Sequence, residues 1–294
     1  MQSTELNTLL KNLATQLALC NLTEHEALTE AWMLLENITG KSKAALLADH
    51  DLVLTSEQSQ RLTEWLDQRI RQRKALYYVL GALPFYNVEI FIQPPILIPR
   101  PETEEWVTWL IDQLTPVAHV PLAVLDLCTG SGCIALALAK SLPQAQVVGI
   151  DINPNACDLA EKNKQHNSIT NATFVQSDLF SSCSGMSFDL IVANPPYIAK
   201  SEYETLQPEI LAWEDERALV AGQEGLAFYE WIAQEARTYL KPNSVIARKG
   251  LPSLVVEVGQ KPERVVSIFV QHGYRKATLY KDIRGAGRWV GVWV

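Results

Sequence analysis

The sequence lacks the patterns typical of secreted, zinc-binding and membrane-spanning proteins. Its five cysteines form no Cys-x-x-Cys pair and its five histidines form no His-Glu-x-x-His motif, so we predict neither a disulfide framework nor a metal site. No run of 18 apolar residues is present, which argues against a membrane-spanning helix. The N-terminal segment has no basic stretch followed by an apolar run, so we expect no signal peptide. From the cysteine pattern we expect that the thiols are reduced and that the protein is cytoplasmic.

Positive charge is also scarce in this chain. It has 25 Lys and Arg residues against 33 Asp and Glu residues, and its formal net charge is -8. Proteins that bind nucleic acid mainly through phosphate contacts need basic surfaces, so no direct nucleic-acid partner is expected. The 294 residues are 48 % hydrophobic, which is enough for one large domain or two of ordinary size. We expect the chain to be a monomer.

The first 75 residues predict helices only. Thr23–Glu26 fits a capping box, and Gly40 is placed to end the helix behind it. A second box at Thr55–Gln58 begins a helix that runs towards Arg73. We therefore predict a small all-helical domain over residues 1–75. The cations near the end of its last helix, which we interpret as charges at a helix C-terminus, are Arg69, Arg71, Arg73 and Lys74.

The rest of the chain predicts a hairpin followed by an α/β domain. Residues 76–100 are aromatic, β-branched and interrupted by Gly and Pro, which indicates a β-hairpin linker. From residue 101 to residue 294, strand-like apolar runs alternate with helical stretches. This alternation predicts a Rossmann-like, doubly wound, mostly parallel sheet with helices on both faces. Ligands of such sheets bind at the carboxyl ends of the strands.

Three consecutive strands end in residues suited to a nucleoside ligand. The first is followed by the loop Asp126–Gly132, "DLCTGSG", whose glycines allow a sharp turn and a close approach of the backbone. The second ends in Asp151, which can accept hydrogen bonds from ribose hydroxyls, and the third in Asp178 and Leu179, which suit an adenine ring. The third glycine of a dinucleotide fingerprint is missing. Asp126 favours an ammonium-bearing ligand without phosphate, such as S-adenosylmethionine. Asp178 could alternatively cap the next segment.

The fourth strand ends in "NPPY", Asn194 to Tyr197. A planar NH2 group is a poor nucleophile, and two fixed acceptors on its N–H bonds help its lone pair to leave the plane. The Asn194 side-chain oxygen and the Pro195 carbonyl are the candidate acceptors, and Pro196 removes a competing N–H. Tyr197 can stack on a flat substrate. The alternative is a simple strand-ending turn.

In this order, "DLCTGSG", "GID", "QSD" and "NPPY" resemble class I methyltransferases that act on planar amino groups. The segment "ILIPRPETEEWV" from Ile96 to Val107 is similar to the signature of the release factor glutamine N5-methyltransferase family. The resemblance implies transfer of a methyl group from S-adenosylmethionine to the glutamine side chain of the Gly-Gly-Gln motif in class I peptide chain release factors, with S-adenosylhomocysteine as product. It also implies that the N-terminal helices help to bind the release factor.

The candidate site residues follow from the motifs and the resemblance together. Candidate catalytic residues are Asn194, Pro195 and Tyr197. Candidate cofactor-binding residues are Asp126, Cys128, Thr129, Gly130, Ser131, Gly132, Asp151, Asp178, Leu179 and Asn194. Candidate substrate-binding residues are Asn194, Pro195, Pro196, Tyr197, Arg100 and Glu102. Residues 99–104 can also be interpreted as a rigid linker with acids in the first turn of a helix.

The chain departs from this family in two places. Leu179 stands where the family often has a larger aromatic residue against adenine, and the loop over residues 242–253 is longer than the family's usual Gly-Gly turn. Three alternatives remain at this point. They are an adenine N6-methyltransferase acting on nucleic acid, a methyltransferase for a ribosomal-protein glutamine, and a cofactor-binding scaffold without catalytic activity.

Overall fold

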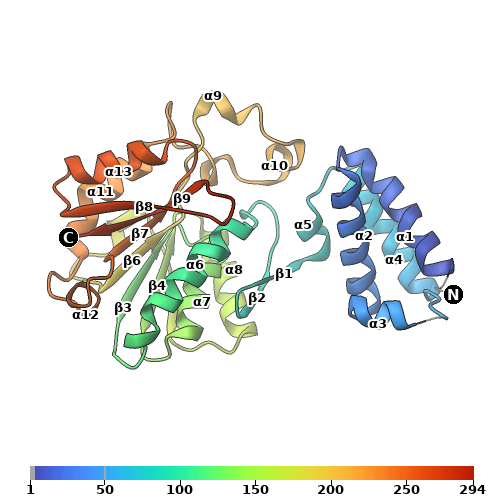
Figure 1. The fold of residues 1–294 in the computed structure, drawn as a ribbon, viewed down its shortest axis with the longest axis horizontal. Coiled ribbons are helices and arrows are strands. Elements are labelled where there is room, and N and C mark those ends of the chain that lie inside the picture. The colour runs from blue at the N-terminus through green and yellow to red at the C-terminus, as the bar shows by residue number, and fades with distance from the viewer. Residues whose placement is uncertain (1–3, 50) are drawn as a thin grey trace. The chain divides into compact units, whose positions relative to one another are not determined.

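The computed structural model describes residues 4–49 and 51–294, which form two compact units (Figure 1). One unit contains the residues up to Gly81 together with Gln207–Trp213, and we call it the helical unit. The other contains Ala82–Leu206 and Glu214–Val294, and we call it the sheet unit. Met1–Ser3 and His50 of the predicted helical domain lie outside the described residues.

Capped amphipathic helices build the helical unit. Both predicted capping boxes are present, because the side chains of Thr23 and Thr55 accept from the backbone N–H of Glu26 and Gln58 and those two side chains accept in return. Gly40 ends the second helix at a φ of 67°. The core is mainly leucine. The helices are α1 (Thr4–Leu17), α2 (Glu24–Thr39), α3 (Lys43–Ala48), α4 (Ser56–Ile70), α5 (Leu76–Leu80) and α10 (Pro208–Trp213), with the 3-10 helix η1 (Ala18–Cys20).

The cations near the end of α4 have a partner that the sequence did not indicate. Arg69 is buried and pairs with Glu30 at 2.8 Å and with Glu209 of α10 at 3.0 Å. Arg73 also reaches Glu209, at 3.0 Å. Lys74 lies over the ring of Trp213, also in α10, at 5.5 Å from its centroid. Three of the four cations therefore contact the distant segment α10. Their interpretation as charges at a helix C-terminus describes their position but not this role.

A seven-stranded sheet forms the second unit, as the alternating pattern predicts. The strand order is β5-β4-β3-β6-β7-β9-β8, with parallel pairing except where β9 pairs with β7 and β8. The strands are β3 (Ala123–Leu127), β4 (Gln146–Asp151), β5 (Ala172–Gln176), β6 (Leu190–Ala193), β7 (Leu254–Glu257), β8 (Lys276–Lys281) and β9 (Gly287–Trp293). The central strands β6 and β7 are buried along their whole length, which explains their continuous apolar sequences.

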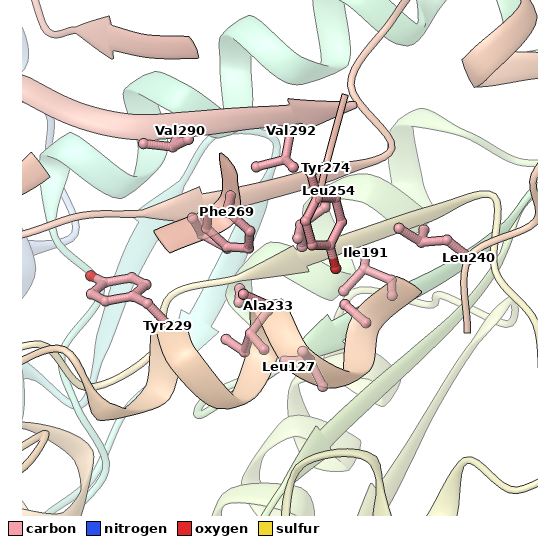
Figure 2. Packing of buried hydrophobic residues seen from close by; sticks show 14 of the residues in the cluster. Leu127, Ile191, Tyr229, Ala233, Leu240, Leu254, Phe269, Tyr274, Val290 and Val292 are labelled. Atoms are coloured by element: carbon pink, nitrogen blue, oxygen red, sulfur yellow. The ribbon is translucent and has the colours of Figure 1, made fainter. Parts of the chain in front are cut away.

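Helices connect the strands and complete the core. They are α6 (Pro101–Leu114), α7 (Cys133–Ser141), α8 (Pro154–His166), α9 (Lys200–Tyr203), α11 (Ala227–Tyr239), α12 (Val245–Arg248) and α13 (Pro262–Gln271), with η2 (Thr115–Val117), η3 (Leu179–Ser182) and η4 (Glu216–Ala218). Figure 2 shows side chains of α11, α13 and the central strands packed in one buried cluster that includes Ile191, Tyr229 and Phe269. In the described part of the chain, no helix is both long and apolar enough to cross a membrane.

Two segments differ from the sequence-based organisation. The predicted hairpin over 76–100 is shorter, because Leu76–Leu80 forms α5 and only β1 (Ala82–Phe85) and β2 (Val88–Phe91) pair, in antiparallel register. Gly81, at a φ of 84°, ends α5 and marks the boundary between the units. The second segment is α10, which follows the fourth strand of the alternating pattern in sequence but packs in the helical unit.

Candidate active site

A cavity of about 590 Å³ lies at the carboxyl ends of β3, β4, β5 and β6. This is the edge of the sheet where the sequence places its candidate residues. Nine of them line the cavity: Cys128, Thr129, Gly130, Ser131, Asp151, Asp178, Leu179, Asn194 and Pro196. The structure therefore brings together the ends of four strands that the motifs singled out separately.

Asp126 supports the glycine loop from inside the protein through hydrogen bonds. This carboxylate is buried, does not line the cavity, and accepts from Thr129 Oγ1 at 2.6 Å and from the backbone N–H of Ala135 at 3.1 Å. Burial raises the pKa of Asp126 to about 7, although both hydrogen bonds act in the opposite direction. The expected direct contact of Asp126 with a ligand is thus replaced by support of the loop.

Gly132 is the N-cap residue of α7 and shows why the loop needs glycine. Its φ is 81°, a conformation that other residues rarely adopt. A Cβ at this position would also lie 2.8 Å from Ala160 Cβ on α8. Gly132 is therefore required for the turn and for helix packing, and it does not itself line the cavity.

Asp151 connects the glycine loop to the cavity. One carboxylate oxygen accepts from the backbone N–H of Gly130 at 2.9 Å, and the other accepts from that of Asn153 at 2.9 Å. Burial raises the pKa of Asp151, and these two hydrogen bonds lower it. Each carboxylate oxygen can accept a second hydrogen bond, so Asp151 can still bind two hydroxyl groups of a ligand.

Asp178 and Leu179 lie farther along the same wall of the cavity. The Asp178 side chain makes no cap hydrogen bond to η3, so the alternative cap role is not realised. Ile152 and Trp231 also line the cavity, and their side chains are 49 % and 47 % exposed. This end of the cavity therefore offers an exposed carboxylate and an apolar surface, which suit a flat ring with an amino group.

Asn194 is oriented by a buried network from α6 and β7. Its Nδ2 donates to Thr103 Oγ1 at 3.3 Å. Thr103 Oγ1 donates to Glu257 Oε2 at 2.7 Å, and Trp106 Nε1 donates to the same oxygen at 2.8 Å. Thr103, Trp106 and Glu257 are all buried, and Thr103 lines the cavity beside Asn194. No sequence motif indicated Thr103 or Glu257 as site residues, although Thr103 lies inside the "PRPETE" segment.

The remaining residues of "NPPY" have different surroundings. Pro195 is buried and does not line the cavity, whereas Pro196 does. The Tyr197 ring lies against Gly259, where an added Cβ would come within 2.5 Å of Cδ2, and it does not line the cavity either. Burial raises the pKa of Tyr197 to about 12, and the nearby carboxylate of Glu257 adds to this effect. The ring therefore packs against the backbone beside the cavity rather than facing it as expected.

Arg100 and Glu102, both expected to bind substrate, do not line the cavity. Arg100 Nη2 contacts both carboxylate oxygens of the buried Glu214 at 2.6 Å. Burial raises the pKa of Glu214, and the Arg100 guanidinium lowers it. Glu102 lies in the first turn of α6, 3.7 Å from Arg288. Both residues therefore make ion pairs, in agreement with the alternative interpretation of the segment as structural.

Further cavity residues were missed by the motifs. Asp215 and Arg217 line the cavity and pair with each other, with Arg217 Nη2 donating to Asp215 Oδ2 at 2.7 Å. Asn153 also lines it, and its Nδ2 donates to Asp215 at 3.5 Å. A polar pair two residues apart is too common in sequences to indicate a site. Among the described residues, no three His, Cys, Asp or Glu side chains are grouped to hold a metal ion.

Two family models match this chain. Residues 8–81 match the PrmC N-terminal domain, and residues 108–223 match the Methyltransferase small domain. The chain is 37 % identical over 236 residues to the release factor glutamine methyltransferase of Thermodesulfovibrio yellowstonii, covering 80 % of this chain and 81 % of that protein. It is 35 % identical to the Escherichia coli protein of the same name, covering 86 % and 87 %. For that of Flavobacterium psychrophilum the identity is 32 %, covering 97 % and 99 %.

Solved structures share the fold of the chain at low sequence identity. The hMettl16 catalytic domain in complex with an RNA hairpin has a TM-score of 0.54 and 16 % identity, covering 81 % of this chain and 80 % of that one. A Thermus thermophilus 16S rRNA methyltransferase in complex with AdoMet and guanosine has a TM-score of 0.53 and 17 % identity, covering 72 % and 50 %. The predicted class I methyltransferase fold is thereby confirmed.

Proposed function

This chain belongs to the release factor glutamine methyltransferase family, and we propose that it methylates the side-chain amide nitrogen of the glutamine in the Gly-Gly-Gln motif of class I peptide chain release factors. The observation that carries this proposal is the position of Asn194. Its side chain lines the cavity at the end of β6, next to the loops that follow β3 and β4. The family relation does not favour the adenine N6-methyltransferase or ribosomal-protein alternatives, and it supports an enzyme rather than a scaffold.

We propose S-adenosylmethionine as the methyl donor, because the cavity wall fits it. Asp151 offers acceptors for ribose hydroxyls, and Ile152, Asp178 and Leu179 offer a site for adenine. Ser131 Oγ is buried without a hydrogen-bond partner among the described residues, so a polar ligand group could satisfy it. When bound, this cofactor supplies an electrophilic methyl group on a sulfonium and leaves as S-adenosylhomocysteine.

The substrate amide would be held by two acceptors at the start of "NPPY". No hydrogen bond among the described residues occupies Asn194 Oδ1 or the Pro195 carbonyl oxygen, although only Asn194 lines the cavity and Pro195 is buried directly after it in the chain. One acceptor on each N–H of the glutamine amide would orient its nitrogen and favour the loss of planarity that gives it a usable lone pair. The rigid Pro195-Pro196 pair limits reorganisation of these acceptors. The proton released by the amide can pass to water.

Mass spectrometry of a purified class I release factor tests the function. After incubation with this protein and S-adenosylmethionine, the peptide that contains Gly-Gly-Gln should gain one methyl group on the glutamine. A reaction without S-adenosylmethionine is the control for the donor, and Asn194→Ala is the control for the site. Methylation of adenine in nucleic acid instead, or no transfer to the release factor, would contradict the proposal.

We also propose that the helical unit binds the release factor. Its surface carries exposed apolar side chains, of which Leu19 is 70 % and Val53 is 78 % exposed. Replacing both by serine should raise KM for the release factor and leave cofactor affinity unchanged. Ile283→Ser is the matched control, because Ile283 is 90 % exposed but belongs to the sheet unit. An unchanged KM in the double variant would contradict this role. The expected monomeric state, cytoplasmic location and lack of nucleic-acid binding stay predictions.

A further inference from the structure

The proposed mechanism needs the oxygen of the Asn194 amide to face the substrate. Oxygen and NH2 occupy equivalent positions on an asparagine side chain, and a rotation of 180° exchanges them. With NH2 in the cavity, the side chain would present donors to a substrate nitrogen that carries only N–H groups. The mechanism therefore depends on whatever fixes the orientation of this amide.

Counting protons along the buried network shows what fixes it. Trp106 Nε1 can only donate, and it donates to Glu257 Oε2 at 2.8 Å. The Thr103 hydroxyl has a single proton, and it donates this proton to the same oxygen at 2.7 Å. Thr103 Oγ1 can then only accept from the Asn194 amide, and only Nδ2 can supply that hydrogen bond, at 3.3 Å. The oxygen of Asn194 is left for the cavity.

We propose that Thr103 is a positioning residue for methyl transfer. Glu257 fixes the direction of the Thr103 hydroxyl, and Thr103 in turn holds the Asn194 amide with its oxygen towards the substrate. This inference rests on the proposed function. It assigns to Thr103 no contact with the cofactor and no proton transfer. Its effect on the reaction passes entirely through Asn194.

The burial of Glu257 supports this role. Its exposed fraction is only 3 %, and it lies at the end of β7, a strand that is buried along its whole length. Burial raises the pKa of Glu257, whereas the hydrogen bonds from Thr103 and Trp106 lower it. Burying a carboxyl group costs free energy, whereas an apolar side chain at the same position would not have this cost. The hydrogen bonds that Glu257 accepts therefore explain why a carboxyl group stands here. Here its two hydrogen bonds set the direction of the proton chain that ends at Asn194.

Variants at Thr103 test the proposal. Thr103→Val keeps the shape but removes the hydroxyl, and we expect kcat to fall about 10- to 100-fold because the Asn194 amide is free to turn. KM for the release factor and Kd for S-adenosylhomocysteine should stay within about threefold, because the Thr103 hydroxyl is already occupied by Glu257 and Asn194. Thr103→Ser restores the hydroxyl and should restore most of kcat. Glu257→Gln should also retain activity, because its amide oxygen can accept both hydrogen bonds. If Thr103→Val does not fold, Thr103→Ala takes its place.

A second measurement needs no substrate. The side-chain amide resonances of Asn194, identified by their loss in Asn194→Ala, should show slow proton exchange in the wild type and in Thr103→Ser. They should lose this protection in Thr103→Val. If the wild type does not methylate release factors, the proposed function fails, and this exchange measurement still decides whether Thr103 orients Asn194.

Three results would overturn the inference while leaving the proposed function intact. The first is wild-type kcat in Thr103→Val. The second is an equal loss of kcat in Thr103→Val and Thr103→Ser, which would point to packing instead of the hydroxyl. The third is a loss of kcat/KM in Thr103→Val that comes entirely from a rise in KM or in Kd for S-adenosylhomocysteine. This result would mean that Thr103 contacts a ligand directly.

Discussion

The two halves of the cavity are built in different ways. The half formed by β3 and β4 presents a glycine loop, and Asp151 is fixed there by the backbone N–H groups of Gly130 and Asn153. The half formed by β6 presents Asn194, which is fixed by side chains from α6 and β7. The first half is thus specified by residues 2 and 21 positions apart, and the second by residues 91 and 154 positions apart. We expect substitutions in the first half to change cofactor affinity and those in the second to change turnover.

Asn194→Ala should have the largest effect and tests the second half directly. We expect kcat for methylation of a release factor to fall about 10²- to 10³-fold, because one of the two fixed acceptors for the amide is lost. The Kd for S-adenosylhomocysteine, measured by calorimetry, should stay within about threefold. A large loss of cofactor affinity with little change in kcat would reverse the comparison between the halves.

Asp126→Asn tests whether Asp126 supports the loop as a buried carboxyl group. The pKa of Asp126 is raised from 3.8 to about 7 by burial, so between these values the folded chain binds a proton that the unfolded chain has lost. The wild type should therefore lose stability as the pH rises through this range. Asparagine does not titrate. The free energy of unfolding of the variant relative to the wild type should rise by about 1 kcal/mol per pH unit between about pH 5 and 7.

Denaturant titrations at several pH values measure this difference. A constant difference between Asp126→Asn and the wild type across the same range would show that Asp126 titrates normally in the folded chain.

Asp151→Asn sharpens the comparison from the first half. The substitution removes one of the two charged acceptors, so Kd for S-adenosylhomocysteine should rise about 10-fold. The kcat at saturating cofactor should change by less than about threefold, because the role proposed for Asp151 is to bind the cofactor and not the substrate. A fall in kcat as large as that of Asn194→Ala would show that the halves do not act separately.

Leu179→Phe should have the smallest effect. Leu179 lines the cavity beside the proposed adenine site, so a larger ring at this position should improve packing on adenine. We expect Kd for S-adenosylhomocysteine to fall about two- to threefold, with KM for the release factor unchanged. Weaker cofactor binding in this variant would mean that Trp231 and Ile152 already fill the space beside the ring.

Strand ends and helix caps could be predicted because they depend on local sequence. The capping boxes at Thr23 and Thr55 and the loop Asp126–Gly132 all appear in the structure as expected. The partner of a charged residue could not be predicted in the same way. Arg100 was expected at the substrate, but Glu214 neutralises it from more than 100 residues away in sequence.

The sequence by itself determined the α/β alternation, the four strand ends that line the cavity and the family to which the chain belongs, because each depends on contiguous residues. Only the tertiary structure decided that α10 packs in the helical unit, that Tyr197 lies against Gly259, and that Thr103 and Glu257 hold Asn194. These contacts join residues that are distant along the chain. Folding alone brings them within hydrogen-bonding or packing distance, so no local pattern could reveal them.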